Sequence, residues 1–283
     1  VIYSSVDLRH SGFKVVPVDT NLFPAGFNHL SEAARDRAVI SFQRYVQQHA
    51  PGAKKILLLP ENHTRNLGYL ENVRVLEGLL LRAGFEVQIG RLEEGLEAPL
   101  TLETLGGGNI TQQPLQRQGN RLVTNGGFDA DLLLLNNDLT SGIPPLLEGL
   151  EQWLVPNPSQ GWHRRRKSQH FERYCTLARA FAQKFGIDCW LITAIAERSA
   201  EVDFKERIGM EALEAKVADV LTRIQKKYDE YKVTEQPYVY LKADAGTYGM
   251  GIMTVSRPEE LRELNKKIRN KMDVIKEGAH VTE

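Results

Sequence analysis

The residues of this sequence with the clearest chemical signature are one lysine and three glycines near its C-terminal end. Residues 238–255 read YVYLKADAGTYGMGIMTV, in which Lys242 stands on a β-rich segment and is followed by Gly246, Gly249 and Gly251. Glycines let the backbone approach phosphate oxygens and present its N–H groups to an anion, and a lysine ammonium supplies a point charge. The pattern therefore predicts a binding site for phosphate groups.

The order of these residues separates the motif from two other phosphate-binding motifs. In a P-loop the lysine follows the glycines at the start of a helix, and the dinucleotide fingerprint also leads from a strand into a helix. Here Lys242 comes first, and the glycines lead into a second β-rich segment at 252–255. We therefore predict a hairpin whose glycine-bearing connection covers a phosphate tail. The alternative is an exposed hairpin turn, but a connection of about six residues is longer than usual and carries the bulky Tyr248 and Met250.

The elements that must position this motif follow from the hydrophobic pattern. Apolar residues at helical spacing predict helices, and short apolar runs without polar alternation predict strands that are covered on both faces. Their alternation is typical of an α/β fold with a mostly parallel sheet. We expect strands at 14–18, 55–59, 85–89 and 132–135, helices at 31–49, 69–83 and 168–185, and a small hairpin within an excursion over 91–127.

A chain of 283 residues is long enough for two domains. We predict an N-terminal α/β substrate domain over 1–195, followed over 196–283 by part of a second domain that contains an amphipathic helix at 210–231 and the glycine hairpin. The 36 basic and 36 acidic residues give a formal net charge of zero, which argues against a general nucleic-acid or membrane-surface binder. Two cysteines without zinc-site spacing favour a reducing cytoplasm.

The glycine hairpin resembles the central domain of ATP-grasp ligases, where a strand lysine precedes a glycine-rich hairpin. The wording KADAGTYGMGIMTV is close to that of the proteobacterial glutamate–cysteine ligases. The same resemblance extends to VDLRHSGFKVVPVDTNLFPAGFNHL at 6–30, to LLLPENHTRNLGYLENV at 57–73, and to NNDLTSGIPPLL and GWHRRRKSQHF at 136–147 and 161–171. It covers almost the whole chain, and it implies a pre-ATP-grasp-like N-terminal sheet domain followed by the first part of an ATP-grasp domain.

The reaction that this resemblance implies is the first step of glutathione biosynthesis. ATP converts the γ-carboxyl of glutamate to an acyl phosphate, and the amine of cysteine displaces phosphate to give γ-glutamylcysteine and ADP. Positioning and electrostatics carry most of such catalysis. We expect Lys242, as a ligand of the ATP phosphates, and Arg165 to act in catalysis, and the resemblance implies that an earlier lysine, Lys205 or its competitor Lys216, contacts ATP as well. The residues that would close over the nucleotide are Gly246, Thr247, Tyr248, Gly249 and Gly251.

Polar side chains follow several predicted strands, where open α/β sheets carry their ligand sites. Arg65 is suited to a substrate carboxylate, and His63 and Asn66 to its amino group, although Asn66 also suits a helix N-cap. Simple turn chemistry is the alternative to substrate contact for Asn21 and for Asn136, Asn137 and Asp138.

The most basic run is HRRRKSQH at 163–170. Cations just before a helix N-terminus oppose the helix dipole unless an anion joins them, so we expect Arg165, Lys167 and Ser168 to bind phosphate or substrate carboxylate. A solvated helix start is the alternative, and a nucleic-acid patch is disfavoured by the neutral total charge.

ATP-grasp enzymes hold Mg²⁺ with carboxylates and an asparagine from the C-terminal half of the fold. The sequence ends at Glu283 in what reads as the start of a strand, so we expect no metal ligands within these residues and incomplete catalysis by them alone. Glutamate, cysteine and ATP are the expected partners, with no nucleic acid or membrane, and the oligomeric state is left open. Rival interpretations are another ATP-grasp carboxylate–amine ligase, such as a glutathione-synthetase-like enzyme, and a non-catalytic nucleotide-binding regulatory protein.

Overall fold

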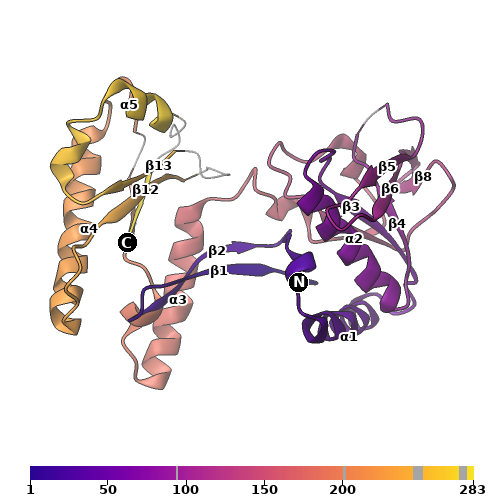
Figure 1. The fold of residues 1–283 in the computed structure, drawn as a ribbon, viewed down its shortest axis with the longest axis horizontal. Helices are drawn as coiled ribbons and strands as arrows, with labels where there is room; N and C mark the ends of the chain where they lie inside the picture. The colour runs from indigo at the N-terminus through magenta and orange to yellow at the C-terminus, as the bar shows by residue number, and fades with distance from the viewer. Residues whose placement is uncertain (94, 200–201, 245–250, 274–278) are drawn as a thin grey trace. The chain divides into compact units, whose positions relative to one another are not determined.

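The computed structural model describes residues 1–93, 95–199, 202–244, 251–273 and 279–283 (Figure 1). The chain divides into two compact units, each described by itself below. Unit 1 comprises 1–5 and 21–163, and unit 2 comprises 6–20 and 164–283. The sequence-based boundary at 195/196 falls inside unit 2, because a long helix and an N-terminal hairpin belong with the second sheet.

Unit 1 is built on a six-stranded mixed sheet. Neighbouring strands are parallel except at one edge, where the last pair is antiparallel, so the predicted mostly parallel sheet is confirmed. The strands lie in the order β10 (Trp153–Val155), β9 (Leu132–Asn136), β3 (Lys55–Pro60), β4 (Glu86–Gly90), β6 (Asn109–Gln113) and β5 (Leu100–Glu103).

Both faces of the central strands are buried, because successive side chains of a strand point to opposite faces. On one face Ile56 and Leu58 pack with α1 (Glu32–His49) and α2 (Leu67–Arg82). On the other face Leu57 and Leu59 join a second apolar cluster that includes Phe23. Each fully buried aliphatic side chain contributes about 1.5–3 kcal/mol. This double burial explains why these strands lack polar alternation in the sequence.

The excursion over 91–127 contains more strand than expected. Besides β5 and β6 it holds a separate two-stranded sheet of β7 (Leu115–Gln118) and β8 (Arg121–Thr124). These strands are only four or five residues long, and β5, β6 and β7 are partly exposed, so their apolar signal in the sequence is weak. The polar loop after β9 continues through two short 3-10 turns at Pro145–Leu147 and Pro158–Gln160.

Unit 2 is built on an antiparallel sheet in the order β11-β14-β12-β13. Its strands β12 (Val239–Ala243) and β13 (Ile252–Val255) pair antiparallel, as the hairpin interpretation requires, and their connection at 245–250 lies outside the described residues. The remaining elements are β11 (Ala196–Arg198), β14 (Ala279–Thr282), α3 (Lys167–Phe185), α4 (Met210–Tyr231), α5 (Lys266–Met272) and the two-stranded hairpin of β1 (Ser5–His10) and β2 (Val15–Asn21).

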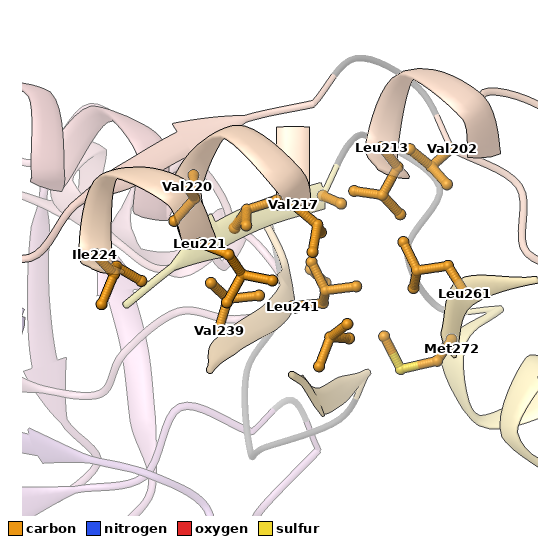
Figure 2. Packing of buried hydrophobic residues seen from close by; sticks show 14 of the residues in the cluster. Val202, Leu213, Val217, Val220, Leu221, Ile224, Val239, Leu241, Leu261 and Met272 are labelled. Atoms are coloured by element: carbon orange, nitrogen blue, oxygen red, sulfur yellow. The ribbon is translucent and has the colours of Figure 1, made fainter. Parts of the chain in front are cut away.

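One face of this sheet packs against the amphipathic helix α4. Figure 2 shows Val217 and Leu221 of α4 among the side chains that meet Val239 and Leu241 of β12. All four belong to one apolar cluster, in which Val217, Val239 and Leu241 are fully buried. Because side chains alternate along β12, Lys242 points to the opposite face of the sheet. The packing of α4 on one face therefore leaves Lys242 on the other face of the sheet.

Candidate functional site

Lys242 is one of three basic side chains in a row across the second face of the unit 2 sheet. In the strand register Lys242 pairs with His280 of β14, and His280 pairs in turn with Arg198 of β11. Side chains at directly opposed positions of neighbouring antiparallel strands share a face and lie about 5 Å apart at Cβ. The ammonium of Lys242 also lies 5.0 Å from the ring centroid of Tyr240.

The charges around Lys242 are mainly positive. Burial lowers the pKa of Lys242, and the positive charges of Lys167 and Arg9 lower it further, while the negative charge of Asp19 raises it. Burial likewise lowers the pKa of Lys167, with Asp19 opposing this effect. Partly buried cations that depress one another's pKa are stabilised when an anion joins them. The cluster therefore suits a multiply charged anion such as a phosphate chain.

Arg165 lies at the edge of this cluster in a defined position. Its guanidinium forms an ion pair with Asp19 in the last part of β2, and burial lowers its pKa. The structure thus brings Lys242, from the glycine hairpin, together with Lys167 and Arg165, from the basic run.

Asp244 holds the N-terminus of α3 beside β12. Its backbone oxygen accepts from the Lys167 N–H at 3.0 Å, and its carboxylate accepts from the N–H and the hydroxyl of Ser168, both at 2.8 Å. Nε of Arg198 lies 3.1 Å from the same carboxylate, which is 2% exposed. A buried carboxylate with several donors is well satisfied. Asp244 therefore fixes Lys167 near Lys242, and the Ser168 hydroxyl has a structural partner within the protein.

The other predicted nucleotide contacts are placed differently. Lys205 lies in an exposed turn, where its N–H donates to Oδ1 of Asp203 at 2.8 Å. Lys216 of α4 lies 3.6 Å from a carboxylate oxygen of Glu197. Gly251 is buried with φ of 63°, a left-handed conformation that favours glycine. The remaining predicted loop contacts, Gly246, Thr247, Tyr248 and Gly249, lie outside the described residues.

In unit 1 a pair of carboxyl groups lies at the carboxyl ends of β3 and β9. The Asp138 N–H donates to Oε1 of Glu61 at 3.1 Å, and Nε2 of His63 lies 3.9 Å from Oε2 of Glu61. Burial raises the pKa of Glu61 to about 7, and the negative charge of Asp138 raises it as well. The hydroxyl of Tyr69 accepts from the Glu61 N–H and donates to the Asn136 carbonyl, both within 2.9 Å.

Most of the amide side chains predicted as substrate contacts have structural partners. Asn66 caps α2 by accepting from the Tyr69 N–H at 3.1 Å. Asn136 is buried and donates to the Pro24 carbonyl at 2.8 Å. Turn-like bonds to nearby backbone N–H groups occupy Oδ1 of Asn21 and of Asn137, and Arg65 is exposed beyond the α2 N-terminus.

Sequence reasoning missed three residues that organise these two sites, whereas Asp138 was already considered together with Asn136 and Asn137. Glu61 stands directly after a buried strand, a position that could have identified it. Asp244 and His280 gave no such signal, because their roles depend on α3 packing against a sheet that is distant in sequence. Only the strand pairing reveals that His280 neighbours Lys242.

Comparison with known proteins decides the family. A family model for glutamate–cysteine ligase matches residues 1–283. The chain belongs to the glutamate–cysteine ligase family. A solved structure described as "Putative gamma-glutamylcysteine synthetase", from Methylobacillus flagellatus KT, shares 46% sequence identity at a TM-score of 0.90. The match covers 99% of this chain and 67% of that chain.

A second solved structure is much more distant. D-alanyl-alanine synthetase A from Vibrio cholerae matches with a TM-score of 0.40 and 10% identity, over 81% of this chain and 58% of its own, and at that level it carries no argument. Comparison with curated proteins gives no match. The family assignment rests on the match to the family model and on the 46%-identical solved structure. It makes this protein an ATP-dependent ligase that joins glutamate to cysteine in glutathione synthesis.

Two further features concern the described part of the chain. None of the helices found there combines the length and the apolar character that crossing a membrane requires. Within the same residues, no three His, Cys, Asp or Glu side chains gather closely enough to hold a metal ion.

Proposed function

We propose that this ligase follows the ATP-grasp mechanism, with the phosphate tail of ATP lying over the face of the unit 2 sheet that is opposite α4. The observation that carries the proposal is the electrostatic neighbourhood of Lys242, where Lys167 and Arg9 add positive charge and Asp19 supplies one negative charge. A triphosphate would neutralise this excess. We propose Lys167, instead of Lys205, as the second lysine that contacts ATP. The reason is that the positive charge of Lys167 acts on Lys242.

The proposed chemistry needs electrostatics and alignment more than a reactive side chain. The γ-carboxylate of glutamate attacks the γ-phosphorus of ATP, ADP leaves, and an acyl phosphate forms. The cations spread over Lys242 and Lys167 stabilise the charge that develops on the transferred group and on the leaving diphosphate. Arg165, held by Asp19, would orient an oxygen of the same phosphate chain. The Gly246–Gly251 segment would cover the nucleotide, as the sequence motif predicts.

Magnesium accompanies ATP in this class of reaction. Within the described residues no three His, Cys, Asp or Glu side chains form a group that could hold a metal ion. We expect lysine and arginine to supply positive charge on this side of the nucleotide.

We assign the carboxyl pair of unit 1 to the ammonium group of an amino-acid substrate. Burial and, to a smaller extent, the negative charge of Asp138 raise the pKa of Glu61, so a bound cation would relieve the cost of its ionised form. Arg65 and His63, from the same loop, would meet the α-carboxylate. Asn66, Asn136, Asn137 and Asn21 would then shape the loops around the substrate.

Glu61→Gln is expected to change substrate affinity and pH dependence together. Loss of the charge should raise KM for the amino acid bound there by about 10- to 100-fold, because a hydrogen bond to a charged group is lost. Steady-state kinetics with glutamate and cysteine varied in turn would reveal this rise for one of them. Unchanged KM values for both amino acids would show that the carboxyl pair of unit 1 binds neither of them.

At alkaline pH the Glu61→Gln variant should be more stable than the native protein. The folded-state pKa of Glu61, about 7, lies above its ordinary value of 4.5, so its contribution is complete below pH 4.5 and is lost as pH rises through 7. Glu61→Gln should therefore raise the free energy of unfolding by about 1 kcal/mol at pH 8.5 and leave it nearly unchanged at pH 5. Urea titrations at the two pH values measure the difference, and a gain at pH 5 alone would contradict the assignment.

The function itself is tested by product formation in the full-length enzyme. Incubation with ATP, Mg²⁺, glutamate and cysteine should yield γ-glutamylcysteine and ADP in equal amounts, and omission of either amino acid should abolish both. Replacement of cysteine by glycine with γ-glutamylcysteine as the carboxylate substrate tests the glutathione-synthetase-like alternative, and turnover of that pair alone would favour it. An acyl phosphate would be trapped by hydroxylamine as the γ-glutamyl hydroxamate.

A further inference from the structure

A cavity of about 670 Å³ lies in unit 2 between the first turns of α3 and strand β11. It is lined by residues of α3, by β11, by Asp244 and by His280. Its volume suits a small molecule of amino-acid size with accompanying water. The cavity adjoins the row of basic residues described above, since Arg198 and His280 belong to both.

His280 is the buried polar side chain of this cavity whose bonding is incomplete within the described residues. Its side chain is 1% exposed, yet neither ring nitrogen has a hydrogen-bond partner among the described residues. The ring stacks on Phe171 of α3 with centroids 4.7 Å apart, which fixes its orientation. Burial lowers its pKa to about 4, so at neutral pH the imidazole carries one N–H donor and one acceptor nitrogen. Leaving both unpaired is costly, and such groups are rare unless a ligand or water meets them.

The arginines that line the cavity are suited to a ligand with carboxylate groups, and the lining carboxylate of Asp244 is already paired with Ser168 and Arg198. Arg166, Arg179 and Arg198 all line it. Each guanidinium has five N–H donors, so a contact with the protein at one edge is compatible with a carboxylate at another. Glu197 also lines the cavity, but it lies 2.7 Å from the guanidinium of Arg223, outside the lining. Glu172, at the exposed side of α3, is available to an ammonium group.

The position of the cavity relative to Lys242 decides which substrate it suits. His280 is the strand-register partner of Lys242, so a group that bonds His280 lies beside the proposed phosphate site. Only the substrate that accepts the phosphoryl group must place a carboxylate there. Glutamate has one carboxylate for this position and a second carboxylate and an ammonium for the outer part of the cavity.

We propose that the cavity between α3 and β11 is the glutamate subsite, and that His280 donates a hydrogen bond to the γ-carboxylate and so positions it beside Lys242. This inference rests on the proposed function, because it takes the phosphate tail to lie at Lys242. The arginines of the cavity hold the α-carboxylate, and Glu172 faces the ammonium.

The test uses His280→Phe in the full-length enzyme. Phenylalanine keeps the stacking on Phe171 and fills a similar volume, but it has no ring nitrogen. We expect KM for glutamate to rise at least about tenfold, since a hydrogen bond to a charged group is lost, while KM for ATP stays within about twofold. The thermal midpoint should be unchanged or higher, because two buried unpaired nitrogens are removed. His280→Gln, which restores one donor and one acceptor, should recover part of the affinity.

The control is His49→Phe, a ring substitution at an exposed histidine of α1 that stacks on Tyr45, and it should leave every KM unchanged. If His280→Phe does not fold, Arg179→Met at the exposed rim of the cavity carries the test with the same expected rise for glutamate. A glutamate KM within about twofold of the native value in these variants overturns the subsite. Loss of ATP affinity in His280→Phe, without a change for glutamate, would assign the cavity to the nucleotide instead.

Failure of the glutamate subsite can be distinguished from failure of the proposed phosphate site. If Lys242→Met leaves ATP affinity unchanged, the phosphate site is wrong whatever happens at His280. If Lys242→Met weakens ATP and His280→Phe leaves glutamate unaffected, only the glutamate subsite is wrong.

Discussion

Lys242→Met is expected to lower kcat/KM for ATP by about 100- to 1000-fold, the loss seen when one preorganised electrostatic contact to a developing charge is removed. Methionine retains the length and apolar stem of lysine. Because burial and the neighbouring cations already depress the pKa of Lys242, removing its charge relieves repulsion, and the thermal midpoint should not fall. Initial-rate kinetics with ATP varied, together with a thermal melt, measure both effects. Lys167→Met should cause a loss of similar size.

Lys205→Met is the matched control, because it removes a lysine from an exposed turn of the same unit. It should leave kcat/KM within about twofold. Equal losses at Lys205 and Lys167 would mean that the cation pair around the sheet face does not define the phosphate site, and a native rate for Lys242→Met would refute the account of that lysine.

Asp244→Ala is expected to cause the largest loss of stability among the residues of the site. The variant leaves the Ser168 N–H, the Ser168 hydroxyl and the Arg198 guanidinium without their shared acceptor at a position that is 2% exposed. Breaking a buried charged network in this way costs about 3–5 kcal/mol. Urea unfolding followed by circular dichroism should therefore show a large drop in midpoint. Asp244→Asn, which keeps one acceptor oxygen, should lose less.

A surface carboxylate provides the comparison for this loss. Asp36 forms an ion pair with Arg82 but its side chain is 62% exposed, so Asp36→Ala should cost no more than about 1 kcal/mol. Asp244→Ala should also lower activity more than its stability loss explains, because the α3 N-terminus carries Lys167. A stability loss as small as that of Asp36→Ala would show that Asp244 does not hold the helix.

The strands and long helices could be predicted from the sequence because their signals are local. The expected strands at 55–59 and 132–135 match β3 and β9 closely, and the helix expected at 210–231 matches α4. Their apolar residues are buried on both faces or along one stripe, which is what the periodicity encodes. Strand β1 was not predicted, because most of its residues are exposed and give no hydrophobic pattern. Its backbone pairing with β2 stabilises it instead.

The candidate sites were predictable only in part. Lys242 and Lys167 could be selected from motifs, and Arg165 from its place in a basic run. The sequence could not show that Lys167 shares the neighbourhood of Lys242, because that depends on Asp244 holding the N-terminus of a helix that begins 77 positions earlier in the chain. The substrate roles of Asn66 and Asn136 remain predictions, and the bonds that these side chains make explain why cap and turn chemistry were equally good interpretations.

The most direct measurement is a crystal structure of the full-length enzyme with Mg²⁺ and a non-hydrolysable ATP analogue. The account predicts that the β- and γ-phosphates contact the ammonium groups of both Lys242 and Lys167 on the face of the unit 2 sheet opposite α4. Phosphates bound away from both lysines, with the cationic face occupied by solvent, would contradict it.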